Sequence, residues 1–170
     1  MTALVAAGVA LMVASCGDDA SPEPPPGVEV FDDLSREHVE GDVDYDGSPP
    51  VGGPHAPVWQ NCGFYDEPVP EERAVHSMEH GAVWITYRPD LAEADVERLR
   101  ELATGDAGAG EGYVLVSQYP DQPAPVVATA WGRQLQLPSA SDPPLEQFVA
   151  AFVQGPQTPE PGAPCSGGAG

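Results

Sequence analysis

The chain has 170 residues, a length that suits one domain of ordinary size with a short segment attached to it. It contains 27 acidic residues against 6 basic ones, which gives a formal net charge of -21. This charge repels nucleic acids and anionic lipid head groups, and it therefore argues against DNA, RNA and peripheral membrane binding. Cations, by contrast, are attracted to such a surface.

The N-terminal residues have the pattern of a lipoprotein signal peptide. Residues 3–14 are apolar or small, a run too short to span a bilayer as a helix, which takes about 20 residues. The run ends in small residues directly before Cys16, which is what a lipoprotein signal peptidase requires. We expect residues 1–15 to be removed and Cys16 to carry lipid on the outer face of the cell membrane.

Behind this cysteine the sequence predicts a tether and one folded unit. Residues 16–27 are acidic and rich in proline, with too little apolar content to pack, so they are expected to stay extended. Residues 28–170 are expected to form a single globular domain. Its first part, residues 28–70, is rich in Gly, Pro and Asp but also contains aromatic side chains, which predicts a long ordered loop region.

Regular structure is predicted after this loop region. Segments rich in β-branched and aromatic residues predict strands, and segments with apolar residues at helical spacing between charged ones predict amphipathic helices. The strands are expected at 82–87, 113–119 and 126–137, and the helices at 91–103 and 142–152. This order predicts an α+β fold, in which two helices cover a small sheet that is mainly antiparallel or mixed.

Two cysteines remain once Cys16 carries lipid. Outside the cytoplasm an even pair is most simply one disulfide, so Cys62 and Cys165 are expected to be joined. The cross-link would close a loop of roughly one hundred residues and stabilise the fold by a few kcal/mol. The alternative is a nucleophilic Cys62 thiolate, which needs an unpaired thiol and a nearby base.

The histidines are the candidate functional residues. The chain has 4 of them, and none lies in its C-terminal half. His76 and His80 share one face if the segment is a helix, and they point to the same side if it is a strand. Either geometry makes a pair of metal ligands, because neutral imidazole is the commonest protein ligand for zinc and copper. Gly81, a residue type that often follows the last turn of a helix, favours the helical geometry.

These residues predict a copper or zinc site formed by His55, His76 and His80. Two ligands bind a metal weakly, so a third has to come from the irregular segment before them, where His55 lies in a stiff, proline-rich loop. His38 is the fourth candidate ligand, and Glu79 is expected to orient one of the histidines. No organic cofactor is expected.

Two other functions remain open. The spacing of His76, Glu79 and His80 also matches inverted zinc peptidases, in which two histidines hold zinc and the glutamate is the general base. Such a hydrolase needs a further carboxylate ligand and a substrate cleft, so an enzyme is less favoured than a binding module. The second alternative is a metal-free interaction module, in which the histidines hold loops by hydrogen bonds. The aromatic segment 59–65 would then contact a partner protein or peptidoglycan.

Three long motifs resemble the bacterial family known as domain of unknown function 3105. They are Pro49–His55, Trp59–Pro70 and Ala74–Pro89, and the resemblance extends from about His38 to Gly167. It implies an exported or membrane-anchored protein but no activity, because none is established for the family. Met78 stands where the family pattern His-x-Leu-Glu-His-Gly has leucine, which favours core packing over a ligand role for this residue.

The lipid anchor can be tested directly. In Cys16→Ser the thioether that carries the lipid cannot form, so we expect the protein to move from the membrane fraction to the soluble fraction when cells are fractionated. Ser21→Ala, a change in the tether, is the control and should leave the protein with the membranes. If Cys16→Ser partitions with the membranes as the parent does, lipid anchoring is wrong.

Overall fold

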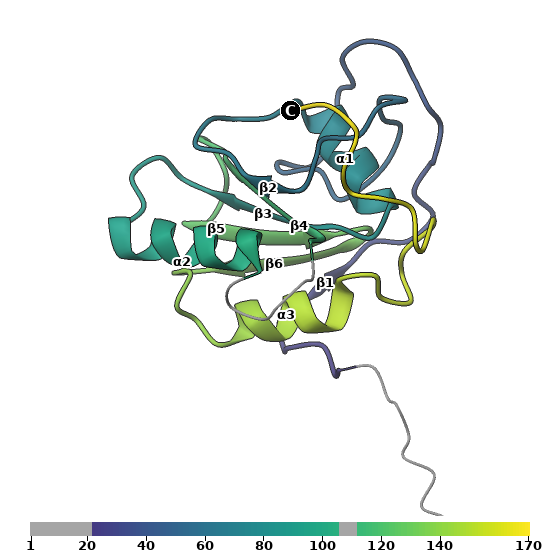
Figure 1. Cartoon of the computed structure of the whole chain (residues 1–170). Helices are drawn as coiled ribbons and strands as arrows, with labels where there is room; N and C mark the ends of the chain where they lie inside the picture. Colours follow the sequence, from purple (N-terminus) through teal and green to yellow (C-terminus); the bar gives the residue numbers. More distant parts are fainter. Residues whose placement is uncertain (1–21, 106–111) are drawn as a thin grey trace, which may run out of the picture.

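The computed structural model describes residues 22–105 and 112–170, and within them it contains one six-stranded sheet and three helices (Figure 1). The strands are β1 (Glu29–Val30), β2 (Gly63–Phe64), β3 (Val83–Tyr87), β4 (Val114–Gln118), β5 (Val126–Ala130) and β6 (Arg133–Leu137). The helices are α1 (Glu71–Glu79), α2 (Glu93–Thr104) and α3 (Pro144–Phe152). None of these described helices is long and apolar enough to cross a membrane. The expected signal peptide, Cys16 and the first part of the tether lie outside the described residues.

The sheet is mixed, and its strands lie in the order β1-β6-β5-β3-β4-β2. The central strand β3 pairs parallel with β4 and antiparallel with β5. Because a parallel pair needs a crossover connection, α2 joins β3 to β4. The short strands β1 and β2 form the two edges and lie inside the predicted loop region, which is therefore not irregular throughout. Each has only two residues, too few for a periodic pattern to show in the sequence.

The prediction of a single strand at 126–137 is wrong, because this segment forms two strands, β5 and β6. The chain turns back at Trp131 and Gly132, and β5 and β6 form an antiparallel hairpin with Val126 opposite Leu137. Gly132 has a φ of 67°, and a Cβ atom there would collide with the carbonyl oxygen of Phe31. Apolar residues continue up to the turn, so the period-2 pattern alone did not reveal the break.

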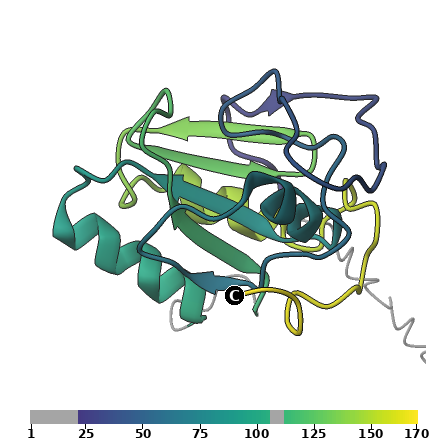
Figure 2. The same cartoon turned by 90° about the horizontal axis from the view of Figure 1, so that it is seen from above.

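The two faces of the sheet carry different helices. α1 covers one face, and α2 and α3 cover the other (Figure 1); Figure 2 shows the α1 side from above. Neighbouring residues of β3 point to opposite faces. Trp84 belongs to the apolar cluster that includes Met78 of α1, while Ile85 belongs to the cluster that includes Leu99 of α2 and Phe148 of α3. Met78 is fully buried, which fits the packing role expected for it.

The prediction of two covering helices is wrong, because α1 is a third helix that packs on the sheet. It begins after Pro70 with Glu71 and Glu72, whose charges are favourable at the N-terminal end of a helix dipole. It ends where Gly81 takes a φ of 94° and its N–H donates to the carbonyl oxygen of Met78 at 3.0 Å. The helix buries polar as well as apolar side chains, so hydrophobic periodicity did not identify it in the sequence.

The C-terminal tail after α3 returns to the α1 side of the molecule (yellow in Figures 1 and 2). The predicted disulfide is confirmed, since Cys62 and Cys165, separated by 103 positions, are joined with their Cα atoms 5.4 Å apart. Main-chain hydrogen bonds continue this contact: the N–H of Asn61 donates to Ala169 at 2.8 Å, and the N–H of Ala169 donates to Trp59 at 2.9 Å. The irregular tail is therefore a fixed part of the domain.

The disulfide closes most of the domain into one loop. In the double variant Cys62→Ala/Cys165→Ala we expect the free energy of unfolding to fall by about 3–5 kcal/mol, because the unfolded chain gains the freedom that the cross-link removes. Urea denaturation followed by circular dichroism measures this loss. Reductant should destabilise the parent and leave the double variant unchanged. A double variant as stable as the oxidised parent would contradict the prediction.

Candidate metal centre

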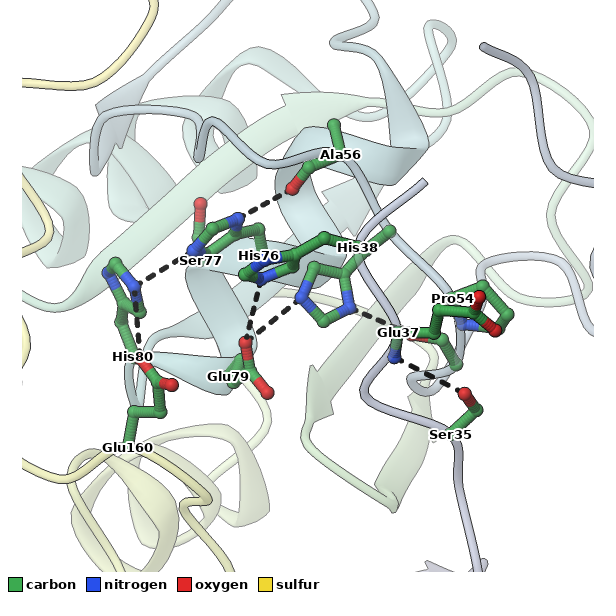
Figure 3. Close-up of polar contacts among 12 residues, drawn as sticks. Ser35, Glu37, His38, Pro54, Ala56, His76, Ser77, Glu79, His80 and Glu160 are labelled. Carbon is green, nitrogen blue, oxygen red and sulfur yellow. Dashed lines mark hydrogen bonds and ion pairs between the residues drawn. The ribbon is translucent and has the colours of Figure 1, made fainter. Parts of the chain in front are cut away.

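Side chains from separate parts of the chain meet at the C-terminal end of α1 (Figure 3). His76, Glu79 and His80 come from the helix and its C-cap, so the helical geometry for this segment is confirmed. His38 and His55 come from two segments that lie side by side in an isolated parallel bridge. Main-chain hydrogen bonds on both sides of His55 hold this bridge together. The loop region before α1 thus brings two further imidazoles to the helix.

Three of the imidazoles are anchored in the same way, through Nδ1. Each Nδ1 lies between 2.6 and 2.8 Å from a main-chain carbonyl oxygen. A carbonyl only accepts hydrogen bonds, so Nδ1 carries the hydrogen, and in a neutral imidazole Nε2 then holds a lone pair. The pairs are His55 with Gly53, His76 with Ala56, and His80 with Pro164.

The Nε2 atoms lie close to one another and to the carboxylate of Glu79 (Figure 3). The Nε2 atoms of His55 and His38 lie 2.9 Å and 3.6 Å from Oε2 of Glu79. The Nε2 atoms of His76 and His80 are 3.0 Å apart. One ligand atom from each of His38, His55, His76 and Glu79 lies within 4.8 Å of all the others, so these four can surround one ion.

These contacts place electron-rich atoms against each other. When the His55 ring is neutral, its Nε2 lone pair faces a carboxylate oxygen of Glu79, and the exposed fractions of the two side chains are only 0% and 3%. A buried carboxylate is costly unless a positive group or a hydrogen-bond donor faces it. A metal cation or an added proton between these atoms makes the contacts attractive. The arrangement therefore favours bound positive charge.

His76 is held in the protonation state that binds metals. Burial lowers the pKa of His76 below the ordinary value of 6.5, and the hydrogen bond to the carbonyl oxygen of Ala56 opposes this only in part. The neighbouring imidazoles of His80, His55 and His38 lower the pKa further, because protonated rings repel one another. His76 is therefore neutral at pH 7, with Nε2 free to bind a cation.

Two tryptophans pack against the imidazoles and restrict their movement. The ring of Trp59 lies 4.8 Å from that of His80 and 5.7 Å from that of His76. Trp131 meets the ring of His55 edge-on at 5.8 Å. In the group of four, the side chain of His38 is the one open to solvent, with 47% of it exposed. The centre thus has aromatic walls and an opening at His38.

The structure brings together three of the four histidines that the sequence singled out, namely His38, His55 and His76. His80 lies beside His76 but outside the group of four. Glu79, which we expected to orient a histidine, places its own carboxylate among the candidate ligand atoms. The difference arises because the helix and the loops turn Glu79 toward His55 and His38 rather than toward its helical neighbours.

One residue near the centre was missed by sequence reasoning. Oε2 of Glu160, in the C-terminal tail, lies 3.7 Å from Nε2 of His80. The two residues are far apart in the sequence, and no spacing pattern joins them. The only sequence signal near Glu160 is the cysteine at 165, whose disulfide fixes the tail beside α1.

Comparisons with known proteins give one match. The family model described as Protein of unknown function (DUF3105) matches residues 38–167. This range begins at His38 and includes Glu160 and both cysteines of the disulfide, so it covers the whole centre. Searches of curated proteins and of solved structures found no match.

The protonation state of His76 can be measured in the metal-free protein. We expect His76 to titrate below pH 6.5, because burial disfavours the charged ring, and its neutral form to carry the hydrogen on Nδ1. Long-range proton–nitrogen NMR spectra recorded across a pH series report both properties. A pKa above 6.5, or a neutral form with the hydrogen on Nε2, would be inconsistent with this geometry.

Proposed function

The chain belongs to the family described as Protein of unknown function (DUF3105), and we propose that its function is to bind a transition-metal ion, copper or zinc, at this centre. One observation carries the proposal. Main-chain carbonyls hold Nδ1 of the buried histidines, so that their Nε2 lone pairs are directed toward each other and toward the Glu79 carboxylate. This is the support that metal-binding histidines commonly receive from the residues behind them.

The chemistry of the four ligands favours copper or zinc. Three imidazoles and one carboxylate suit both ions, and the only cysteines among the described residues are joined to each other. Zinc–nitrogen bonds of about 2.0–2.1 Å place tetrahedral ligand atoms roughly 3.3 Å apart. The distances of 2.9 Å and 3.6 Å from Glu79 to His55 and His38 lie on either side of this value. Because the ligand atoms of all four residues lie within 4.8 Å of one another, the group has to contract around the ion to complete the site.

The charge of the centre supports the same function. A divalent cation offsets the buried carboxylate of Glu79 and accepts the lone pairs that otherwise face it. The net charge of -21 raises the local concentration of cations around the protein, although it does not select among them. His38, with its side chain 47% exposed, is the ligand of the four that an ion in solvent can reach directly.

We infer further that the domain carries out this function outside the cytoplasm, held to the membrane by lipid on Cys16. The inference rests on the signal-peptide pattern before Cys16 and on the acidic tether behind it. The disulfide between Cys62 and Cys165 supports it, because such bonds persist in oxidising compartments. In this proposal the domain is a metal-binding module that lies outside the cytoplasm and is tethered to the membrane.

Neither alternative function is favoured by a specific observation. A hydrolase needs Glu79 as a free general base, but the carboxylate of Glu79 lies among the candidate ligand atoms. An interaction module needs free aromatic side chains in the segment 59–65. There the ring of Trp59 packs on two imidazoles, and the ring of Phe64 lies 3.8 Å beneath the guanidinium of Arg100.

The proposal predicts which substitutions weaken metal binding. Loss of a supporting residue in a metal site costs about 10–100-fold in affinity, so loss of a direct ligand in His55→Gln, His76→Gln or Glu79→Gln should cost about 100-fold or more. Glu97→Gln is the matched control, since this glutamate is 65% exposed on α2 and should keep the parent affinity. Isothermal titration with zinc and with copper, on protein without an affinity tag, measures these differences.

Acid should also release the ion. Imidazoles must be neutral to bind a metal, so affinity is expected to fall as the pH drops below about 6, where protons compete for Nε2. Circular dichroism at each pH separates this effect from unfolding. If the folded parent with an intact disulfide takes up neither zinc nor copper stoichiometrically at pH 7, the proposed function is wrong.

A further inference from the structure

A second set of ligand atoms lies next to the group of four. Nε2 of His80 is 3.0 Å from Nε2 of His76 and 3.7 Å from Oε2 of Glu160 (Figure 3). His80 is buried, whereas the Glu160 side chain is 51% exposed. Both His80 and Glu160 contact or belong to the C-terminal tail, since Nδ1 of His80 lies 2.7 Å from the carbonyl oxygen of Pro164. The set therefore has its own carboxylate and its own access to solvent.

The contact between His76 and His80 needs a positive charge to be favourable. Nδ1 of His80 lies 2.7 Å from the carbonyl oxygen of Pro164, and Nδ1 of His76 lies 2.6 Å from that of Ala56. Both Nδ1 atoms therefore carry their hydrogens, and both Nε2 atoms hold lone pairs when the rings are neutral. Two lone pairs 3.0 Å apart repel each other unless a proton or a metal ion lies between them.

We propose that the centre holds a second divalent transition-metal ion, bound by His76, His80 and Glu160. This inference rests on the proposed function, because the second ion adds to the first. The side chains then divide into two sets of equal composition, each with two imidazoles and one carboxylate, a combination that binds divalent metals and leaves positions open for solvent or a further ligand. The first set is His38, His55 and Glu79, and the second is His76, His80 and Glu160.

His76 links the two sets. One of its ring nitrogens lies within 4.8 Å of the other ligand atoms of the group of four, so His76 completes the first site when one ion is bound. A single lone pair binds a single ion, so with two ions bound His76 coordinates the second ion together with His80 and Glu160 and leaves the first to His38, His55 and Glu79. Two neighbouring cations repel, so the second ion binds more weakly than the first.

The main chain holds Glu160 where the second ion needs it. The N–H of Glu160 donates to the carbonyl oxygen of Glu79 at 3.0 Å, which ties the tail to the end of α1. The side-chain amide of Gln154 donates to the carbonyl oxygen of His80, and the disulfide at Cys165 fixes the tail beyond. The exposed Glu160 carboxylate has room to turn onto an ion without disturbing the core.

The test counts ions site by site. Untagged parent protein with its disulfide intact is titrated with zinc at pH 7, and native mass spectrometry and isothermal titration record the number and affinity of bound ions. We expect two binding steps. Glu160→Gln and His80→Gln should keep the first step within about threefold and weaken the second by at least about tenfold, since each removes a ligand of the second ion only. Glu97→Gln, which removes an equally acidic group on α2, should keep both steps.

Each other outcome overturns the inference in a distinguishable way. One zinc ion in the parent and in Glu160→Gln alike would remove the second site and leave the proposed function standing, while no zinc in the parent would remove both. Loss of the first step in folded His80→Gln would make His80 a ligand of the first ion. Loss of the second step in Glu97→Gln would assign that step to general surface charge. Because Glu160 is at the surface, Glu160→Gln tests the site even if His80→Gln fails to fold.

Discussion

The hydrogen bond from a histidine Nδ1 to a main-chain carbonyl is the interaction on which the metal centre depends. It occurs at His55, His76 and His80, and it fixes both the plane of each ring and the nitrogen that keeps its lone pair. Two of the accepting carbonyls lie in the loop before α1, and one lies in the tail after α3. The irregular segments are therefore as necessary to the centre as the helix that carries two of the imidazoles.

The sheet provides the fixed surface against which these segments are held. On the face of the sheet that α1 covers, Trp84 and Leu115 of neighbouring strands belong to the same apolar cluster as Met78 of α1. Ser77, the next residue toward the N-terminus of that helix, is buried with its hydroxyl oxygen 2.7 Å from the carbonyl oxygen of Gln60. Helix, loop and strand are thus joined by both apolar and polar contacts, and the C-terminal tail is added by the disulfide. This construction keeps the ligand atoms together before any ion arrives, which reduces the entropy lost on binding.

The buried polar residues of α1 differ in whether a suitable hydrogen-bond partner faces them. Ser77 has a carbonyl partner, so its burial costs little. Glu79 is equally buried, and its carboxylate faces Nε2 of His55, which holds a lone pair when that ring is neutral, and Nε2 of His38. A buried carboxylate lowers stability unless a proton or a cation lies between it and such a lone pair, and strained electrostatic contacts of this kind are concentrated at functional sites in proteins. The proposed metal ion would thus stabilise the contacts between the imidazoles and Glu79 from which the site is inferred.

The sequence by itself determined the α+β class, helices α2 and α3, the strands on which they pack, and the pairing of Cys62 with Cys165. These follow from local periodicity and from the count of cysteines. It also placed His76 and His80 on the same side of their segment, with a helix favoured over a strand. Only the tertiary structure decided that α1 is a third covering helix, that the last predicted strand turns at Gly132, and that Glu160 lies beside His80. Such contacts join residues far apart in the chain, and they depend on how loops and tail pack on the sheet, which no local pattern encodes.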